Sequence, residues 1–202
     1  MYENMLQYVK DFLEKTSIGT APKFPFRDRF EHTLRVYKWA LRINEVEQGD
    51  AEILSIAAIF HDIGKWIKSD QPHASVGAEL CDDYLKAALY PEDKRIRVVN
   101  AIRHHSSKSA QDPDLSLEDK ILMDADLLDE VGALAVAWDC MATGLGENAS
   151  YLKACEKLKA VYGQLCKQKP WVRTPTGAKL FQERLDFLKL FIENLEYELG
   201  LS

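Results

Sequence analysis

The stretch ILSIAAIFHDIGK at residues 53–65 decides the fold of this 202-residue chain. Residues Ile53 to Phe60 are apolar on every side of a helix, which is the pattern of a helix buried at the centre of a protein. His61 and Asp62 follow at its end. An adjacent His-Asp pair at a helix end can present both side chains to one metal ion, because local unwinding relieves their angular offset of about 100°. The stretch therefore predicts a buried helix that ends in candidate metal ligands.

Helical periodicity continues on both sides of this stretch. Val36, Trp39 and Ile43 recur at 3.6-residue spacing, and no alternating run is long enough for a strand. The chain is therefore predicted to be all-α, a single domain over residues 1–202 with a bundle of about seven to nine helices. The expected helices cover about 2–15, 27–47, 53–60, 72–89, 91–105, 116–138, 148–168 and 175–199. The motifs lie in a core at about 27–138, on which C-terminal helices at about 148–199 pack.

Composition limits the classes of function. The chain has 26 Lys and Arg against 32 Asp and Glu, a formal net charge of −6, which argues against broad nucleic-acid or membrane-surface binding. The apolar run of residues 53–60 is far shorter than the roughly 20 residues that a membrane helix needs. The four cysteines form no close pair, so we expect a reducing, cytoplasmic location.

The five histidines are the most informative residues. They stand on four predicted helices, together with a cluster of acids among apolar neighbours near residue 126. Imidazole and carboxylate together suit Fe, Mn, Co, Ni or Zn better than an all-oxygen Mg or Ca site. The histidines are His32, His61, His73, His104 and His105, and the acids are Asp124, Asp126, Asp129 and Glu130.

Each of these residues also has an ordinary structural interpretation. A histidine on an apolar helix side, such as His32, is more often a satisfied core residue, and His104-His105 could simply favour a helix C-terminus. At least one acid near residue 126 must point inward, and a buried carboxylate needs a cation or hydrogen bonds. The set as a whole carries more weight than any member.

In order, the pattern His32, His61-Asp62, His73, His104-His105 and Asp126 resembles the HD-domain superfamily of metal-dependent phosphohydrolases. The phrases that carry the resemblance are EHTLRVYKWAL (31–41), AAIFHDIGK (57–65), HASVGAEL (73–80), AIRHHSS (101–107) and ILMDADLLDEVGA (121–133). The segment from Thr174 to Glu198 resembles the tail of an uncharacterised bacterial branch of that superfamily. The resemblance implies an HD-type helical bundle.

The resemblance also implies the metal ligands. His32, His61, Asp62 and Asp126 would bind a first divalent transition metal, with Asp124 as the alternative to Asp126. Family members with additional histidines hold two ions bridged by the Asp of the HD pair, so the expected number is one or two. The second ion would be bound by His73 and by one or both of His104 and His105. His105 is favoured, because Val98, Ala101 and Ile102 share its helical side and should face inward.

The implied function is hydrolysis of a phosphoester or phosphoanhydride, on a nucleotide or a small phosphorylated metabolite. Asp62 would orient the attacking hydroxide, and Lys65 is the foremost phosphate-binding candidate. Arg35, Arg103 and Lys108 are further candidates for substrate binding, each with surface charge as its alternative. Two other functions stay open: a di-iron oxygenase with the same ligand pattern, and a catalytically silent nucleotide-sensing module. The oligomeric state stays open as well.

Overall fold

The computed structural model describes residues 1–17, 24, 26–67, 69–107 and 114–201. This part of the chain contains helices and turns and no strand, which confirms the all-α prediction. None of its helices is long and apolar enough to cross a membrane. The elements are α1 (Tyr2–Ser17), α2 (Arg29–Glu47), α3 (Ala51–Phe60), α4 (His73–Ala87), α5 (Glu92–His104), α6 (Leu117–Asp129), α7 (Ala133–Gly144), α8 (Tyr151–Gln168), the 3-10 helix η1 (Lys169–Trp171) and α9 (Pro175–Glu198).

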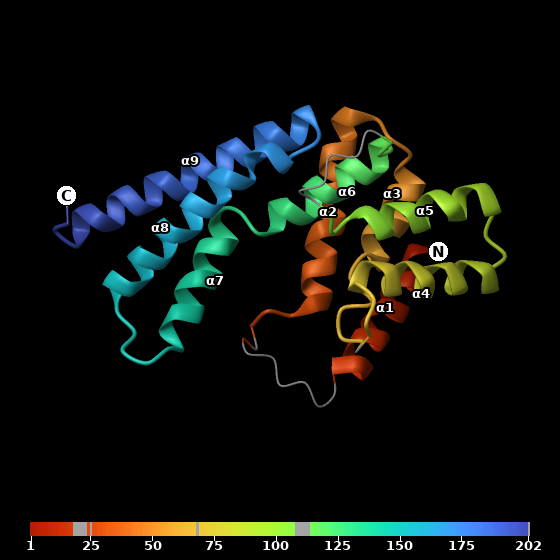
Figure 1. The fold of residues 1–202 in the computed structure, drawn as a ribbon, viewed down its shortest axis with the longest axis horizontal. Helices are drawn as coiled ribbons and strands as arrows, with labels where there is room; N and C mark the ends of the chain where they lie inside the picture. Colours follow the sequence, from red (N-terminus) through yellow and green to blue (C-terminus); the bar gives the residue numbers. More distant parts are fainter. Residues whose placement is uncertain (18–23, 25, 68, 108–113, 202) are drawn as a thin grey trace.

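Helix α3 is the centre of a group formed by α1 to α6 (Figure 1). It contacts all five other helices of that group, and every residue from Ile53 to Phe60 is buried. Burying a large aliphatic or aromatic side chain contributes about 1.5–3 kcal/mol, so this helix anchors the core. Helix α2 packs along α6, and α4 pairs with α5. The ends of these helices supply the functional side chains described below.

Helices α7, α8 and α9 form an extension on the left of Figure 1, whereas the group of α1 to α6 lies at the centre and right. Helix α9 begins beside α2 and α6 and then runs along α8, which in turn contacts α7. The N-terminus of α9 is fixed by Asp124 of α6. Its carboxylate accepts hydrogen bonds from the backbone N–H groups of Arg173 and Thr174, both at 2.8 Å, and from the Thr174 hydroxyl at 2.7 Å.

One predicted helix was wrong. The sequence pattern predicted a continuous helix over residues 116–138, but α6 ends at Asp129 and α7 begins at Ala133. Gly132 lies between them with φ +101°, a conformation that only glycine adopts without strain. The break redirects the chain from the core into the extension.

Local capping explains where the helices begin. The Asp50 carboxylate accepts from the first N–H groups of α3, and Ser116 with Asp119 forms the capping box of α6. Helix α2 begins two residues later than expected because Asp28 is its N-cap and accepts from the N–H of Glu31 at 2.8 Å. An ion pair between Arg95 of α5 and Asp82 of α4 ties that pair of helices together.

Candidate metal centre

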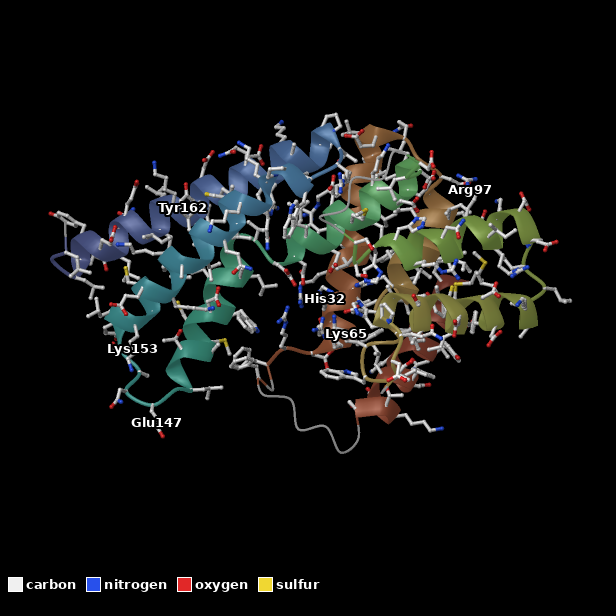
Figure 2. All side chains as sticks on the ribbon, in the orientation of Figure 1. His32, Lys65, Arg97, Glu147, Lys153 and Tyr162 are labelled. Carbon is white, nitrogen blue, oxygen red and sulfur yellow. The ribbon has the colours of Figure 1, made fainter. Side chains whose placement is uncertain are left out.

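Five segments bring histidine and aspartate side chains to one place in the core. His32 comes from α2 and is labelled at the centre of Figure 2. His61 and Asp62 lie in the turn after α3, and His73 is the first residue of α4. His105 directly follows α5, and Asp126 lies in α6. Segments up to 94 residues apart in the chain therefore meet in one cluster, whose members form two neighbouring groups.

The first group consists of His32, His61 and Asp126. The Nε2 atoms of the two histidines lie 3.3 Å apart, and Asp126 Oδ1 lies 3.2 Å from His32 Nε2 and 4.0 Å from His61 Nε2. All three residues are buried. Three potential ligand atoms thus converge on one point.

The second group consists of Asp62, His73 and His105. The Nε2 atoms of the two histidines again lie 3.3 Å apart, and Asp62 Oδ1 lies 3.3 Å from His73 Nε2 and 3.7 Å from His105 Nε2. The other oxygen, Asp62 Oδ2, faces the first group, 3.7 Å from His32 Nε2 and 4.0 Å from His61 Nε2. The Asp62 carboxylate therefore belongs to the second group through Oδ1 and also faces the first group through Oδ2.

Hydrogen bonds to the opposite ring nitrogens orient three of these histidines. His61 Nδ1 donates to the carbonyl of Ala58 at 2.8 Å, and His105 Nδ1 donates to the carbonyl of Ile102 at 2.6 Å. Because a carbonyl only accepts, Nδ1 must carry the hydrogen, which leaves the Nε2 lone pair facing the cluster. His32 Nδ1 is held in the same way by Asp129 Oδ2 at 2.7 Å. Each group therefore has one histidine whose Nε2 is unprotonated, next to a second imidazole nitrogen and a carboxylate oxygen, and this donor set fits a metal ion.

The cluster strongly perturbs the pKa values of its members. Burial lowers the pKa of His61 to about 4, so this ring is neutral near pH 7. Burial also disfavours the charged form of His32, but hydrogen bonds to Asp126 and Asp129 prevail and raise its pKa to about 9. Burial opposes ionisation of Asp62, yet the surrounding histidines and Lys65 keep its pKa well below the usual value. Asp62 is thus an ionised carboxylate inside the core.

Close packing of two glycines brings the turn after α3 onto α4. A Cβ atom at Gly64 would lie 2.4 Å from the carbonyl oxygen of His73 and 2.7 Å from the nitrogen of Gly77. Only glycine permits this approach of the two backbones. The approach sets Asp62 within 3.3 Å of His73.

The sequence analysis missed one charged partner of the cluster, Arg29, whose Nη1 lies 3.0 Å from Asp62 Oδ2. It named Asp129 among the acids near residue 126 but not its partners, and the structure shows that Asp129 binds both His32 and Arg35. Arg35 donates to the two Asp129 oxygens at 2.7 and 3.0 Å. Helical spacing was an available signal for Arg29, which precedes His32 by three residues and so shares its side of α2.

The other candidates lie in different surroundings. His104 contacts Asp119 at 3.3 Å and belongs to neither group of the described residues, whereas His105 belongs to the second. Lys65 Nζ lies 3.9 Å from Asp62 Oδ1 at the rim of the cluster. Arg103 is exposed and contacts Asn100. Asp124, the alternative to Asp126, binds the start of α9 as described above, and Lys108 lies outside the described residues.

Two cavities border the Arg35–Asp129 pair. One, of about 310 Å³, lies between α2, the α6–α7 break and α9. The other, of about 420 Å³, lies between the segment before α2 and helices α7 and α8, and Phe26 and Trp138 are among its aromatic lining residues. Both cavities are thus next to the residues that hold His32.

Known proteins resemble this chain in sequence and in fold. It is 29% identical over 173 residues to the uncharacterized protein YpgQ of Bacillus subtilis, which covers 84% of this chain and 83% of YpgQ. A predicted HD superfamily hydrolase from an uncultured Thermotogales bacterium has 26% identity and a TM-score of 0.70, covering 98% of this chain and 92% of the other.

Two further solved structures share the fold. An HD-superfamily hydrolase from Bacillus thuringiensis has a TM-score of 0.74 at 24% identity, covering 100% of this chain and 97% of the other. B. subtilis YpgQ in complex with ADP has a TM-score of 0.69 at 23% identity, covering 98% and 94%. The HD domain family matches residues 29–130, the segment that carries every member of the two groups. The chain therefore belongs to the HD domain family.

Proposed function

We propose that this protein is a metal-dependent phosphohydrolase that acts on a phosphoester or phosphoanhydride of a nucleotide or small phosphorylated metabolite. The observation that carries the proposal is the position of Asp62, with one carboxylate oxygen toward each of two groups of potential ligands. HD-superfamily hydrolases with the same fold support the hydrolase class.

The donor set suggests which residues would hold metal. His32, His61, Asp62 and Asp126 would bind a first divalent transition metal ion, either Fe, Mn, Co, Ni or Zn. His73 and His105, with Asp62 as the shared ligand, would bind a second. Such an ion, when bound, lowers the pKa of a water molecule from about 16 to about 7, so that hydroxide forms at neutral pH.

Residues of the chain itself would orient the reactants. Asp62 is ionised and would accept a hydrogen bond from the attacking water. Lys65 and Arg29 both contact Asp62 and are partly exposed, 31% and 15% by side chain, so their cations can reach a phosphate that enters the cluster. Their positive charges would stabilise the negative charge that develops on the phosphoryl oxygens.

A nucleotide substrate has independent support. YpgQ, a relative over most of this chain, has been crystallised with ADP. In this chain the cavity of about 420 Å³ places Phe26 and Trp138 near the Arg35–Asp129 pair. Aromatic side chains of this kind stack on nucleobases. The cavity is therefore our candidate for the organic part of the substrate.

The proposal is tested by loading the purified protein anaerobically with Mn²⁺, Co²⁺, Fe²⁺, Ni²⁺ or Zn²⁺ and measuring release of phosphate and pyrophosphate from nucleoside mono-, di- and triphosphates. We expect turnover that a chelator abolishes and that Asp62→Asn reduces by at least about a hundredfold, equivalent to about 2.7 kcal/mol. Asp83→Asn, a change of the same type at an exposed position of α4, is the matched control and should retain activity.

The other outcomes identify the alternatives. Oxygen consumption that requires two iron ions per chain, without phosphate release, would make the protein an oxygenase. Saturable nucleotide binding without turnover on any metal would make it a sensing module. Either result contradicts the proposal.

A further inference from the structure

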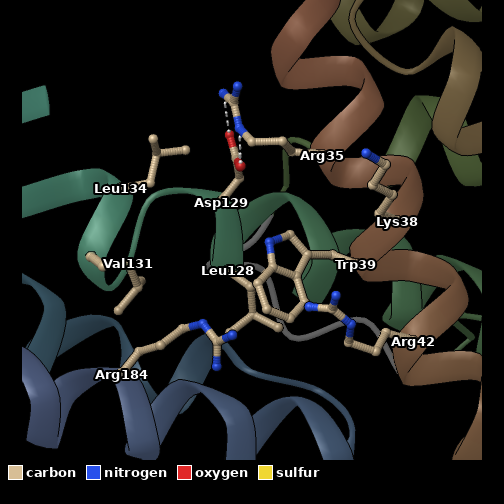
Figure 3. A pocket seen from close by; sticks show the side chains of 10 residues that line it. Arg35, Lys38, Trp39, Arg42, Leu128, Asp129, Val131, Leu134 and Arg184 are labelled. Atoms are coloured by element: carbon tan, nitrogen blue, oxygen red, sulfur yellow. Dashed lines mark hydrogen bonds and ion pairs between the residues drawn. The ribbon is translucent and has the colours of Figure 1, made fainter. Parts of the chain in front are cut away.

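The cavity between α2, the α6–α7 break and α9 has four cationic side chains among the ten residues that line it, beside an apolar floor that includes Leu128 and Trp39 (Figure 3). Lys38 and Arg42 come from α2, and Arg184 comes from α9. With Arg35 they make four positive side chains among the described lining residues, whereas Asp129 is the single acid of that set. This concentration of positive charge contrasts with the formal net charge of −6 for the whole chain.

Three of the four cations have no carboxylate partner among the residues that the structure describes. Arg35 is neutralised by its two hydrogen bonds to Asp129. Lys38, Arg42 and Arg184 form no ion pair within 4.0 Å with any described residue. One Arg184 N–H donates to the carbonyl of Leu180 at 3.0 Å, which leaves further donors of that guanidinium available.

Trp39 holds two of the guanidinium groups in place. The guanidinium carbon of Arg42 lies 4.6 Å from the centroid of the indole ring, and that of Arg184 lies 4.1 Å from it. Figure 3 shows both side chains beside Trp39. Stacking uses the flat face of a guanidinium and leaves the N–H donors along its edge. The Arg184 stem is further fixed by Gly132, whose added Cβ would lie 3.0 Å from Arg184 Cγ. The donors are therefore preorganised, which reduces the entropy lost on binding.

The positive charges around the cavity also repel one another. Burial lowers the pKa of Arg184; Glu183 opposes that effect and Arg42 adds to it. Lys38 and Arg42 are exposed, whereas Arg184 is partly buried, so the repulsion among the three charges is least screened by solvent at Arg184. A multiply charged anion in the cavity would remove this repulsion and accept the available N–H bonds.

We propose that this cavity is a binding site for a compact polyanion that carries phosphate groups, a diphosphate or a phosphate monoester. Its volume of about 310 Å³ is at the small end of the range for ligand sites. None of its lining residues belongs to the two groups of candidate metal ligands, so it is a site distinct from the metal centre. It shares Arg35, Asp129 and Leu134 with the neighbouring cavity of about 420 Å³, but it requires no particular reaction at the metal centre.

The test is calorimetric titration of the metal-free protein with inorganic pyrophosphate and, separately, with ADP. We expect one pyrophosphate per chain bound at this site, with an affinity that falls as salt is added. Arg42→Gln and Arg184→Gln should each weaken binding at least about tenfold. Lys179→Gln removes one charge from an exposed position of α9 and should leave the affinity unchanged.

Two more variants separate this site from the metal centre. Lys65→Gln should retain pyrophosphate binding, because Lys65 lies at the cluster and not in the cavity. Pyrophosphate should also change the tryptophan fluorescence of the wild type, and Trp39→Phe should remove that change. Circular dichroism checks each fold, and Arg184→Lys replaces Arg184→Gln if the latter unfolds.

Three results would overturn the proposal. The first is the absence of saturable pyrophosphate binding by the folded protein. The second is binding that Lys65→Gln abolishes while Arg42→Gln and Arg184→Gln retain it, since the anion would then occupy the metal centre. The third is binding of ADP without binding of pyrophosphate, because the site would then recognise the nucleoside and not the phosphates.

Discussion

Asp129→Asn tests whether the residues behind His32 tune the metal centre. The side chain of Asp129 is only 5% exposed. Its Oδ2 lies 2.7 Å from His32 Nδ1, and its Oδ1 lies 2.7 Å from Arg35 Nε, so the carboxylate links the two residues. Asparagine preserves the shape but loses the charge. Its amide NH₂ must then face a donor, either the His32 Nδ1–H or an N–H of Arg35.

The magnitude follows from that loss. Removing a carboxylate that orients a ligating histidine typically weakens metal binding 10- to 100-fold, or about 1.4–2.7 kcal/mol. The loss should be confined to one ion, because His32 belongs to the first group, whereas His73 and His105 belong to the second. The affinity for the second ion should change by less than the affinity for the first ion.

The assay is competition for Mn²⁺ or Co²⁺ with a fluorescent chelator under anaerobic conditions. Asp83→Asn on the surface of α4 serves as the control. A folded Asp129→Asn protein that binds metal as tightly as the wild type would refute the assigned role of Asp129, and so would an equal loss at both ions.

Three other predictions concern ligand choice and stability. His105→Gln should lower the number of metal ions bound per chain, whereas His104→Gln should leave it unchanged by elemental analysis; the reverse result would exchange the two assignments. Gly177→Ala should destabilise the fold by about 1–3 kcal/mol in urea unfolding, because its Cβ would lie 2.2 Å from Asp124 Oδ2, and equal stability would contradict that packing. Asp82, whose pKa is lowered against the effect of burial by two cations of α4 and α5, should stabilise the protein near neutral pH. The free energy of unfolding lost in Asp82→Asn should therefore shrink as pH falls through the lowered pKa, and a difference that grew in acid would be inconsistent with this pairing.

Much of the site could be predicted because its signals are local. The all-round apolar run ending in His61-Asp62 indicates a buried helix with polar groups at its end, and the structure has that arrangement. The capping box of Ser116 and Asp119 and the proline positions helped to place most helix ends within two residues. The choice of His105 over His104 rested on helical sides, and the structure brings His105 into the second group.

The remaining features depend on tertiary contacts. Asp124 and Asp126 both lie in α6 and both are buried, but one faces the start of α9 and the other faces His32. Sequence periodicity does not reveal which partner each acid meets. The Gly132 break was missed for a similar reason, because a glycine with positive φ looks the same in sequence as a glycine inside a helix. The role of Asp129, which links His32 to Arg35, follows from the structure and not from the sequence.

The proposed binding of transition metal by the cluster around Asp62 is tested most directly by elemental analysis of the wild-type protein after anaerobic loading and gel filtration. The double variant His61→Ala, Asp62→Ala is measured beside it. We predict one or two ions per wild-type chain and little metal in the variant, with an unchanged circular dichroism spectrum. Little metal in the folded wild type after loading with Mn, Fe, Co, Ni or Zn would contradict the account, as would equal metal content in the two proteins.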